Sequence, residues 1–388
     1  MKSTRRQTAI AATTFRSRRG TIVAWTVMGI LFGGICLAFA VNFLWVTGVR
    51  ADSRRCAEAA ALAAAQSLLS DDLLRQQTYP VEHRWRLERS RDAALSIASQ
   101  YQRLQSVAPV EPGAVEFLGA DTQGDVPRAV RVSFESNGQS SRIPLFLSGI
   151  TGLRSAVNGM SCLVELQNTP VALQPTNHVS VPMLPVVLME NNEEGGNTWS
   201  QQIEQYKGSD RYAWVRERNE IEEGPDGLPE LTVVTDWSNR DISVELRPLQ
   251  FEENCTDQQM MRRFVEGITR EDVQLLNREV ISFPGPGQMD LELDCSPAAM
   301  FKRVVGLPRI LCLAKKQAAD EEASDADSGS SVSVELMRPV AARVMNVRVL
   351  SATRVAVTLQ PCVLSTVTAV HGPGADANRY VYSVRPRY

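Results

Sequence analysis

The feature that most constrains this chain is a run of about 29 residues, positions 21–49, with no charged side chain. As an α-helix this run would extend roughly 43 Å, which exceeds the ~30 Å hydrocarbon thickness of a bilayer. A secretory signal peptide has a shorter apolar core of about 7–15 residues. The run therefore predicts an uncleaved, single-pass transmembrane helix over residues 21–49.

A basic leader, residues 1–20, precedes this run. It contains six Lys or Arg residues and no acid, and the first acidic residue of the chain is Asp52. Because Lys and Arg favour the cytoplasmic flank of a membrane helix, we expect the N-terminus inside and everything after Arg50 outside.

The charge of the remaining chain restricts its partners. The whole chain has a formal net charge of −3. Residues 1–50 contribute +7, from seven cations and no acids, so the residues after them have a net charge of −10. An acidic exterior leaves no basic surface to replace phosphate counterions. Nucleic acid is therefore excluded as a partner, and the lipid bilayer is expected as one.

Two helices are expected after the span, over residues 50–105. The first is rich in alanine, which has the highest helix propensity, and should continue the membrane helix without a break. Pro80 opens the second, which is loosely amphipathic and extends to about Leu104.

The rest of the chain is expected to be β-rich. We divide it into a first β-rich region (106–189), a polar insertion (190–228) and a second β-rich region with short helices (229–388), which includes an acidic linker at 315–331. Capping boxes at Thr256 and Thr269 and the pair Ser296-Pro297 mark the helix starts. Short apolar or alternating runs predict strands at 114–118, 129–134, 143–147, 181–188, 231–235, 242–246, 332–337, 342–350, 355–359 and 363–370. The fold class predicted is α+β.

Small residues suggest where helices pack. Gly29 and Gly33 form a GxxxG spacing that lets two membrane helices approach closely, and Asn42 could hydrogen-bond across helices. The alanine-rich helix offers the same close approach. The candidates for packing against partner helices, or for a helix-mediated oligomer, are Gly29, Gly33, Asn42, Ala60, Ala61 and Ala64.

No catalytic, cofactor or metal motif is recognisable. The three histidines, His83, His178 and His371, are far apart and belong to no ligand cluster. The acidic turn at 222–227 is rich in carboxylates, and a solvated turn is favoured there over a calcium site. Cys312 and Cys362 lie in apolar, strand-like runs, so they form either a disulfide or two buried free thiols.

The N-terminal sequence resembles one family. The Arg-Arg-Gly triplet at 18–20, the apolar span and the stretch CAEAAALAAA at 56–65 resemble the N-terminal module of TadE/TadG-like proteins of Tad (Flp) pilus assembly. The usual aspartate before the alanines is Glu58 here. Less specific similarity continues through 129–134, 143–147 and 155–159.

The resemblance implies a non-enzymatic, single-pass accessory of the bacterial cytoplasmic membrane, with its C-terminal domain outside. It would act in Tad-type pilus assembly or surface attachment, through contacts with other pilus-assembly or envelope proteins.

Two other functions remain open. The first is a minor pilin-like subunit cut between Gly20 and Thr21. Such prepilins carry Glu at the fifth position after the cut, whereas this chain has Trp25. The second is a membrane-tethered enzyme or a calcium-dependent adhesin that uses the turn at 222–227.

Overall fold

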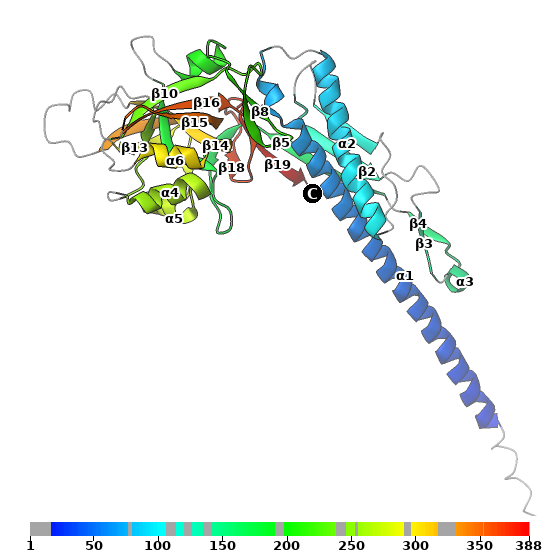
Figure 1. The fold of residues 1–388 in the computed structure, drawn as a ribbon. Coiled ribbons are helices and arrows are strands. Elements are labelled where there is room, and N and C mark those ends of the chain that lie inside the picture. Colours follow the sequence, from blue (N-terminus) through cyan, green and yellow to red (C-terminus); the bar gives the residue numbers. More distant parts are fainter. Residues whose placement is uncertain are drawn as a thin grey trace, which may run out of the picture. The chain divides into compact units, whose positions relative to one another are not determined.

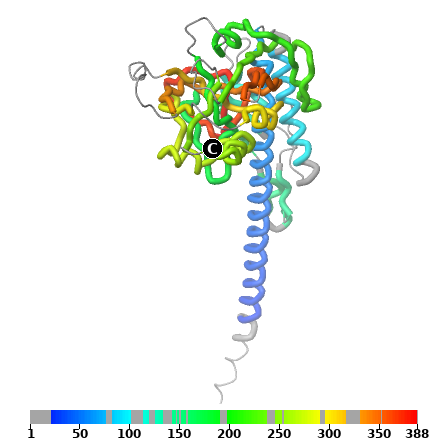
Figure 2. Tube along the Cα trace, turned by 60° about the vertical axis from the view of Figure 1, so that its left-hand side comes forward, coloured from blue at the N-terminus to red at the C-terminus, as the bar shows by residue number. Residues whose placement is uncertain are grey.

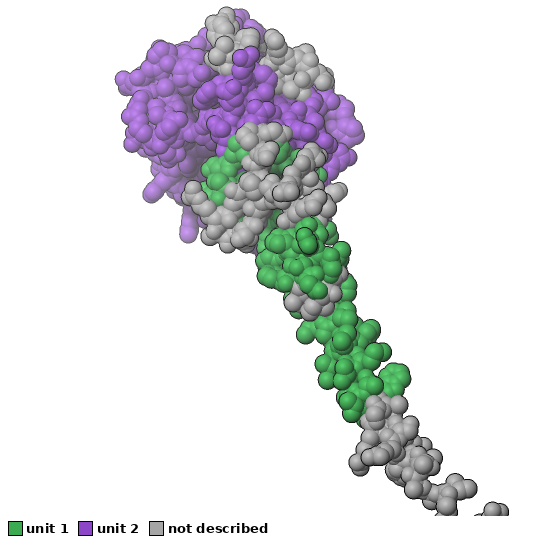
Figure 3. All heavy atoms as spheres, turned by 90° about the vertical axis from the view of Figure 1, so that its right-hand side faces the viewer, with its two compact units in different colours: residues 1–60, 95–114, 132–162 green, residues 61–94, 115–131, 163–388 purple. Residues whose placement is uncertain are grey.

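The computed structural model has an α+β fold in which one long apolar helix precedes a β-rich remainder. Two compact units divide the chain: residues 1–60, 95–114 and 132–162 form unit 1, and residues 61–94, 115–131 and 163–388 form unit 2 (Figure 3). The structure describes residues 17–76, 80–105, 114–119, 126–134, 142–146, 148–157, 159–190, 198–237, 246–252, 255–290, 296–316, 331–351 and 353–387.

Helix α1 is unbroken over Ser17–Leu68, which is 52 residues. It contains no proline, so nothing removes a backbone hydrogen bond along its length. Within the part of the chain that the structure describes, α1 is the one helix long and apolar enough to cross a membrane. The blue N-terminal part of α1, up to the level of residues 142–146, has no described segment beside it (Figures 1 and 2).

Helix α2, Pro80–Gln105, begins at the proline that the sequence marks. Proline suits the first helical position because its missing N–H would have no helical partner there. Between α1 and α2 lies a single 3₁₀ turn, η1, at Asp71–Leu74.

A small hairpin belongs to unit 1. Strands β3, Arg142–Pro144, and β4, Ser155–Val157, are antiparallel, with Ile143 opposite Ala156. The helical turn α3, Ser148–Thr151, lies between them in sequence and closes with a bond from the Gly152 N–H to the Ser148 carbonyl.

A five-stranded sheet has the order β1-β2-β5-β19-β17. Alternate residues Cys162, Val164 and Leu166 of β5 are buried, as expected for a strand with one covered face. Strand β19 is antiparallel to β5, with Ser383 opposite Gln167. The bounds are Val115–Leu118 (β1), Ala129–Phe134 (β2), Met160–Gln167 (β5), Leu364–Ser365 (β17) and Val381–Arg387 (β19).

The larger sheet of unit 2 has the order β10-β16-β15-β14-β7-β11, with β13 also paired to β15. All of its pairs are antiparallel except β14 with β7. Every residue of β7 is buried, so this strand lies in the core. The bounds are Met183–Met189 (β7), Leu231–Asp236 (β10), Leu246–Pro248 (β11), Gly285–Asp290 (β13), Pro308–Lys316 (β14), Ser331–Val349 (β15) and Arg354–Pro361 (β16).

Smaller elements complete unit 2. They are a three-stranded sheet β12-β6-β18, the hairpin β8–β9 and a π-helical turn η4. Their bounds are Pro170–Leu173 (β6), Ser200–Glu204 (η4), Tyr212–Val215 (β8), Glu220–Glu223 (β9), Ile281–Ser282 (β12) and Ala369–His371 (β18).

Three short helices, grouped in Figure 1, carry part of the core: α4 at Asp257–Glu266, α5 at Arg270–Leu275 and α6 at Pro297–Arg303. The capping boxes predicted at Thr256 and Thr269 are both present. The rings of Trp237, Phe264 and Phe301 lie 5.1–6.1 Å apart between centroids. This aromatic cluster contributes large buried apolar area.

The described part of the predicted polar insertion, Glu190 and 198–228, contains buried apolar residues. Residues 191–197 lie outside the described residues, but the rest forms η4 and the β8–β9 hairpin, and Trp199 and Ile203 are buried in the core. The polar composition of the segment concealed these two apolar anchors. Most of the acidic linker, 317–330, lies outside the described residues, and Lys315 and Lys316 end β14.

Candidate functional site

The first half of α1 has a lipid-type surface. Between residues 22 and 45 its large apolar side chains are exposed, Ile30 by 73% and Phe32 by 69%. Exposing this much contiguous apolar surface to water is unfavourable by about 25 cal/mol for each Å². A bilayer removes that cost, so the exposed surface fits a membrane-spanning segment.

The GxxxG pair lies on this open surface. A Cβ added to Gly29 or Gly33 would meet no atom within 4 Å. Among the described residues nothing packs against either glycine, so a contact between two copies of this helix stays a prediction.

One face of α1 is nevertheless buried. In unit 1 it includes Ala38, Asn42, Ser53, Cys56 and Ala60. Their separations of three, four or eleven residues, the last being close to three helical turns, place them on one side of a helix. Cys56 and Ala60 are fully inaccessible. The predicted packing residue Ala60 is thus covered by this chain itself.

In unit 2 the same helix packs against α2. Ala61 and Ala64 are fully buried, as are Ser90 and Ala94 of α2. The Ser90 hydroxyl donates a hydrogen bond of 2.8 Å to the Ala64 carbonyl, which requires the two helices to approach closely. Alanine permits such an approach because its side chain is small.

Asn42 binds a neighbouring strand turn rather than another helix. Its Oδ1 accepts a hydrogen bond of 3.1 Å from the backbone N–H of Phe146, in the turn after β3. Its Nδ2 is buried and has no hydrogen-bond partner within the described residues. Oδ1 thus makes its bond within unit 1, and a bond across helices from Nδ2 stays a prediction.

Trp45, one turn further along α1, adds two contacts to the same hairpin. Its indole N–H donates to the Pro144 carbonyl at 3.1 Å. Its ring meets that of Phe146 edge-to-face, with 4.7 Å between centroids. Nothing in the sequence signalled this contact except Asn42, the one amide side chain in the uncharged run.

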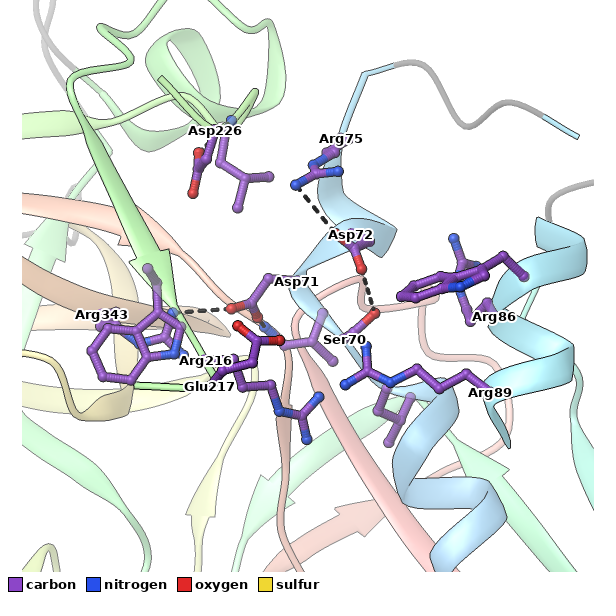
Figure 4. Close-up of a pocket in the computed structure, with 15 residues that line it drawn as sticks. Ser70, Asp71, Asp72, Arg75, Arg86, Arg89, Arg216, Glu217, Asp226 and Arg343 are labelled. Atoms are coloured by element: carbon purple, nitrogen blue, oxygen red, sulfur yellow. Dashed lines mark hydrogen bonds and ion pairs between the residues drawn. The ribbon is translucent and has the colours of Figure 1, made fainter. Parts of the chain in front are cut away.

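A charged cleft of about 540 Å³ lies within unit 2 (Figure 4). Its walls come from η1 and the residues beside it, from α2, from the β8–β9 hairpin and its neighbours, and from β15. Five arginines and four carboxylates line it: Arg75, Arg86, Arg89, Arg216, Arg343, Asp71, Asp72, Glu217 and Asp226.

Most of the carboxylates of the cleft are already bound. Asp71 accepts from Arg343 at 2.9 Å and from the N–H of Val363 at 2.7 Å. The Arg343 guanidinium also lies 4.3 Å from the centre of the Trp214 ring. Asp72 accepts from Ser70 at 3.2 Å, and Figure 4 shows Arg75 directed at it from the other side.

Asp226 differs because burial raises the pKa of its carboxyl group. It accepts from the N–H of Leu228 and from the Gln360 amide. No His or Cys is among the described residues that line the cleft. Because the cleft has one more arginine than carboxylates, it suits a negatively charged group of a partner.

Cys312 and Cys362 are thiols in the structure. Strand β15 separates Cys312, on β14, from Cys362, which follows β16 and donates its N–H to the Ala341 carbonyl. Two strand spacings amount to roughly 9–10 Å, whereas disulfide-bonded Cα atoms lie within about 7 Å. Both cysteines are free, so the disulfide alternative is not formed.

The buried thiols of Cys312 and Cys56 are poorly reactive. Burial raises the pKa of Cys312 to about 12 and that of Cys56 to about 11. Both therefore stay protonated at neutral pH, and a protonated thiol is a poor nucleophile.

Across the described residues, no group of three His, Cys, Asp or Glu side chains gathers in a way that could hold a metal ion. In the acidic turn at 222–227, Glu222 pairs with Arg218. His371 accepts a hydrogen bond at Nδ1 from the Thr169 N–H, and burial together with Arg385 lowers its pKa to about 4. This neutral histidine has a structural role.

The processing candidates Gly20 and Thr21 lie near the start of α1. The leader before Ser17 lies outside the described residues. In comparisons with known proteins, no family model, no curated protein and no solved structure matches this chain.

Proposed function

We propose that this protein is a single-pass, membrane-anchored, non-enzymatic accessory of Tad-type pilus assembly or surface attachment. The basic leader would lie in the cytoplasm of a bacterium and the β-rich residues outside the cytoplasmic membrane. The Tad assignment rests on the sequence resemblance at 18–65, and membrane anchoring rests on α1.

One observation carries the anchoring: α1 changes its surroundings without interrupting its backbone. From residue 22 to 45 most of its large apolar side chains are exposed, whereas from Ser53 to Ala65 the side chains that it buries are small. A helix of a water-soluble protein would bury its large apolar side chains rather than its alanines. The exposed half therefore supports insertion in lipid.

The exterior residues would act through protein contacts. The cleft in unit 2 brings arginine and tryptophan side chains to an accessible surface, and both residue types are enriched where proteins bind one another. An acidic segment of a pilus or envelope partner fits the excess of arginine there.

The proposal is tested on the full chain expressed in a bacterium that carries a Tad system. Membranes are washed with 1 M salt, then with alkaline carbonate, and then solubilised in detergent, and cross-linked partners are identified by mass spectrometry. We expect the protein only in the detergent fraction, together with pilus-assembly proteins. Release by salt alone would reject the anchor, and retention without pilus proteins would reject the Tad assignment.

The N-terminal mass of the recovered protein separates the two pilus-related functions. A chain that retains the basic leader supports the accessory. A chain that begins at Thr21 would instead favour the pilin-like subunit, despite Trp25 at the position where such subunits carry glutamate.

A further inference from the structure

The contact between α1 and the β3–β4 hairpin bears on where the membrane ends. The uncharged run of 21–49 is longer than a bilayer needs, so the sequence leaves the outer boundary of the hydrocarbon undetermined. Residues 21–41 alone would span about 31 Å as a helix, close to the ~30 Å hydrocarbon thickness. The next residue, Asn42, is the first that binds the hairpin.

Backbone chemistry keeps this hairpin out of the hydrocarbon. Strands β3 and β4 form a two-stranded sheet, and no other strand among the described residues pairs with either. Backbone N–H and C=O groups at an open edge cannot be satisfied by lipid tails, so open sheets do not occur within the hydrocarbon region. The hairpin backbone, and with it Asn42 and Trp45, must therefore lie at or outside the headgroups.

The side chains of the hairpin nevertheless favour lipid over water. Phe146 is 63% exposed and Leu153 is 57% exposed. Trp45 binds the hairpin at Pro144. Tryptophan is enriched at the membrane–water interface, because its ring is apolar and its N–H is polar. A polar backbone with outward apolar side chains suits the headgroup layer.

The lipid-type surface also reaches the level of the hairpin. Phe43 and Leu44, which flank the Asn42–Trp45 contact on α1, are each 68% exposed. The helix therefore still exposes apolar side chains at the level where the hairpin binds it.

Accepting that α1 spans a membrane, as proposed above, we infer that the β3–β4 hairpin lies in the outer headgroup layer of a phospholipid bilayer. Phe146 and Leu153 enter the lipid there, and the hydrocarbon crossing ends near Val41. The hairpin thereby acts as a second membrane contact. It fixes the depth of the helix through Asn42 and Trp45.

A photo-crosslinking experiment tests this placement. The full chain is reconstituted in nanodiscs of phosphatidylethanolamine and phosphatidylglycerol, with p-benzoylphenylalanine replacing one residue at a time. The positions are Phe146, Val367 as a control with 62% exposure in unit 2, and Met28 as a control with 66% exposure inside the span. Mass spectrometry then measures the phospholipid adduct at each position.

We expect phospholipid adducts at positions 146 and 28, and at least about tenfold less adduct at position 367, because benzophenone reacts only with what touches it and lipid is confined to the interface and span. Adduct at 28 without adduct at 146 would leave the anchor intact and overturn the hairpin placement. Absence of adduct at both 28 and 146 would overturn the anchor and the hairpin together. Adduct of position 146 with a second copy of the chain, in place of lipid, would also overturn it.

A second measurement reads the depth of Trp45 directly. In the same nanodiscs made with lipids brominated near the headgroup, Trp45→Phe should remove a quenched component of the fluorescence. Lipids brominated near the end of the tails should give a severalfold smaller difference between the two chains. An equal or larger difference with the deep label would place Trp45 in the hydrocarbon and reject the inference.

Discussion

Both halves of α1 have an apolar face, and the two faces differ in side-chain size and in surroundings. Residues 22–45 carry Ile, Phe, Leu and Trp side chains that are mostly exposed, whereas Ala57, Ala60, Ala61, Ala64 and Ala65 are fully buried. A helix face that meets lipid gains from bulk, because large side chains fill the space between tails. A face that meets protein gains from smallness, because small side chains let backbones approach. Side-chain size thus distinguishes the two apolar faces.

The largest expected effect concerns the exposed half. Leu31→Arg places a charge near the middle of the proposed crossing, where insertion loses about 2.5–3.5 kcal/mol. The insertion equilibrium, measured by protease protection of the leader, should fall by roughly two orders of magnitude. Val367→Arg is the control, since Val367 is as exposed as Leu31, at 62%. Equal effects of the two substitutions would contradict a membrane location for Leu31.

The next effect concerns the buried half. Ala64→Leu forces extra volume into a fully packed helix contact, and overpacking of this kind destabilises by about 1–3 kcal/mol. The melting temperature of the detergent-solubilised chain should fall, by roughly 2–4 °C for each kcal/mol in a unit of this size. Ala40→Leu is the matched control in the exposed half and should have little effect. A neutral Ala64→Leu would show that the alanine face is loosely packed.

Lowering the pH should destabilise unit 2 and leave the exposed part of α1 unaffected. Residues 21–49 contain no acid or histidine, whereas unit 2 contains His371. The folded-state pKa of His371 is about 4, below its ordinary value of 6.5. The neutral form is thus favoured by folding, so this stability is complete above pH 6.5 and is lost as the pH falls toward 4. After allowance for solvent screening, the loss is at most about 2 kcal/mol.

The measurement is the free energy of urea unfolding at pH 7 and pH 4.5. The His371→Asn variant keeps an acceptor for the Thr169 N–H but does not titrate, so its stability should change less between these pH values. Substitution of the exposed His178 with Asn serves as the control. An unchanged pH dependence in His371→Asn would show that other groups cause the acid sensitivity.

Local signals in the sequence were sufficient for the elements that depend on local chemistry. The uncharged run predicted the long helix, and the spacing of Thr256 and Gln259 predicted the capping box that begins α4. The alternating run at 129–134 coincides with β2. These features depend on neighbours within a few residues, so one sequence contains the information.

Strand β15 shows how tertiary context overrides a local signal. Two strands were expected on either side of Pro339, but β15 continues through it. The Pro339 carbonyl accepts from the Asn378 side chain, and the N and C=O of a strand residue point to the same side. The missing N–H therefore removes no bond to β14, and Asn378, which makes this possible, is remote in sequence.

The candidate site was less predictable for the same reason. The alanines at 60, 61 and 64 were recognisable from their size, but their partner could not be identified, and α2 of the same chain is the one that binds Ala64. The cleft assembles Asp71 with Arg343, a pair that no periodicity connects. The residue beside the β3–β4 hairpin that binds Asn42 does so through its backbone N–H. Nearly every residue type has this group, so the sequence does not reveal the contact.

The pairing of β5 with β19 has a consequence for biosynthesis. Ser383 can meet Gln167 only after the ribosome has made both strands, and such distant pairings form slowly. If the chain is anchored as proposed above, α1 would already be in the bilayer while the edge of β5 opposite β2 still waits for β19. During that interval an exposed strand edge invites aggregation, so this protein should depend on an export chaperone in proportion to the rate of its translocation.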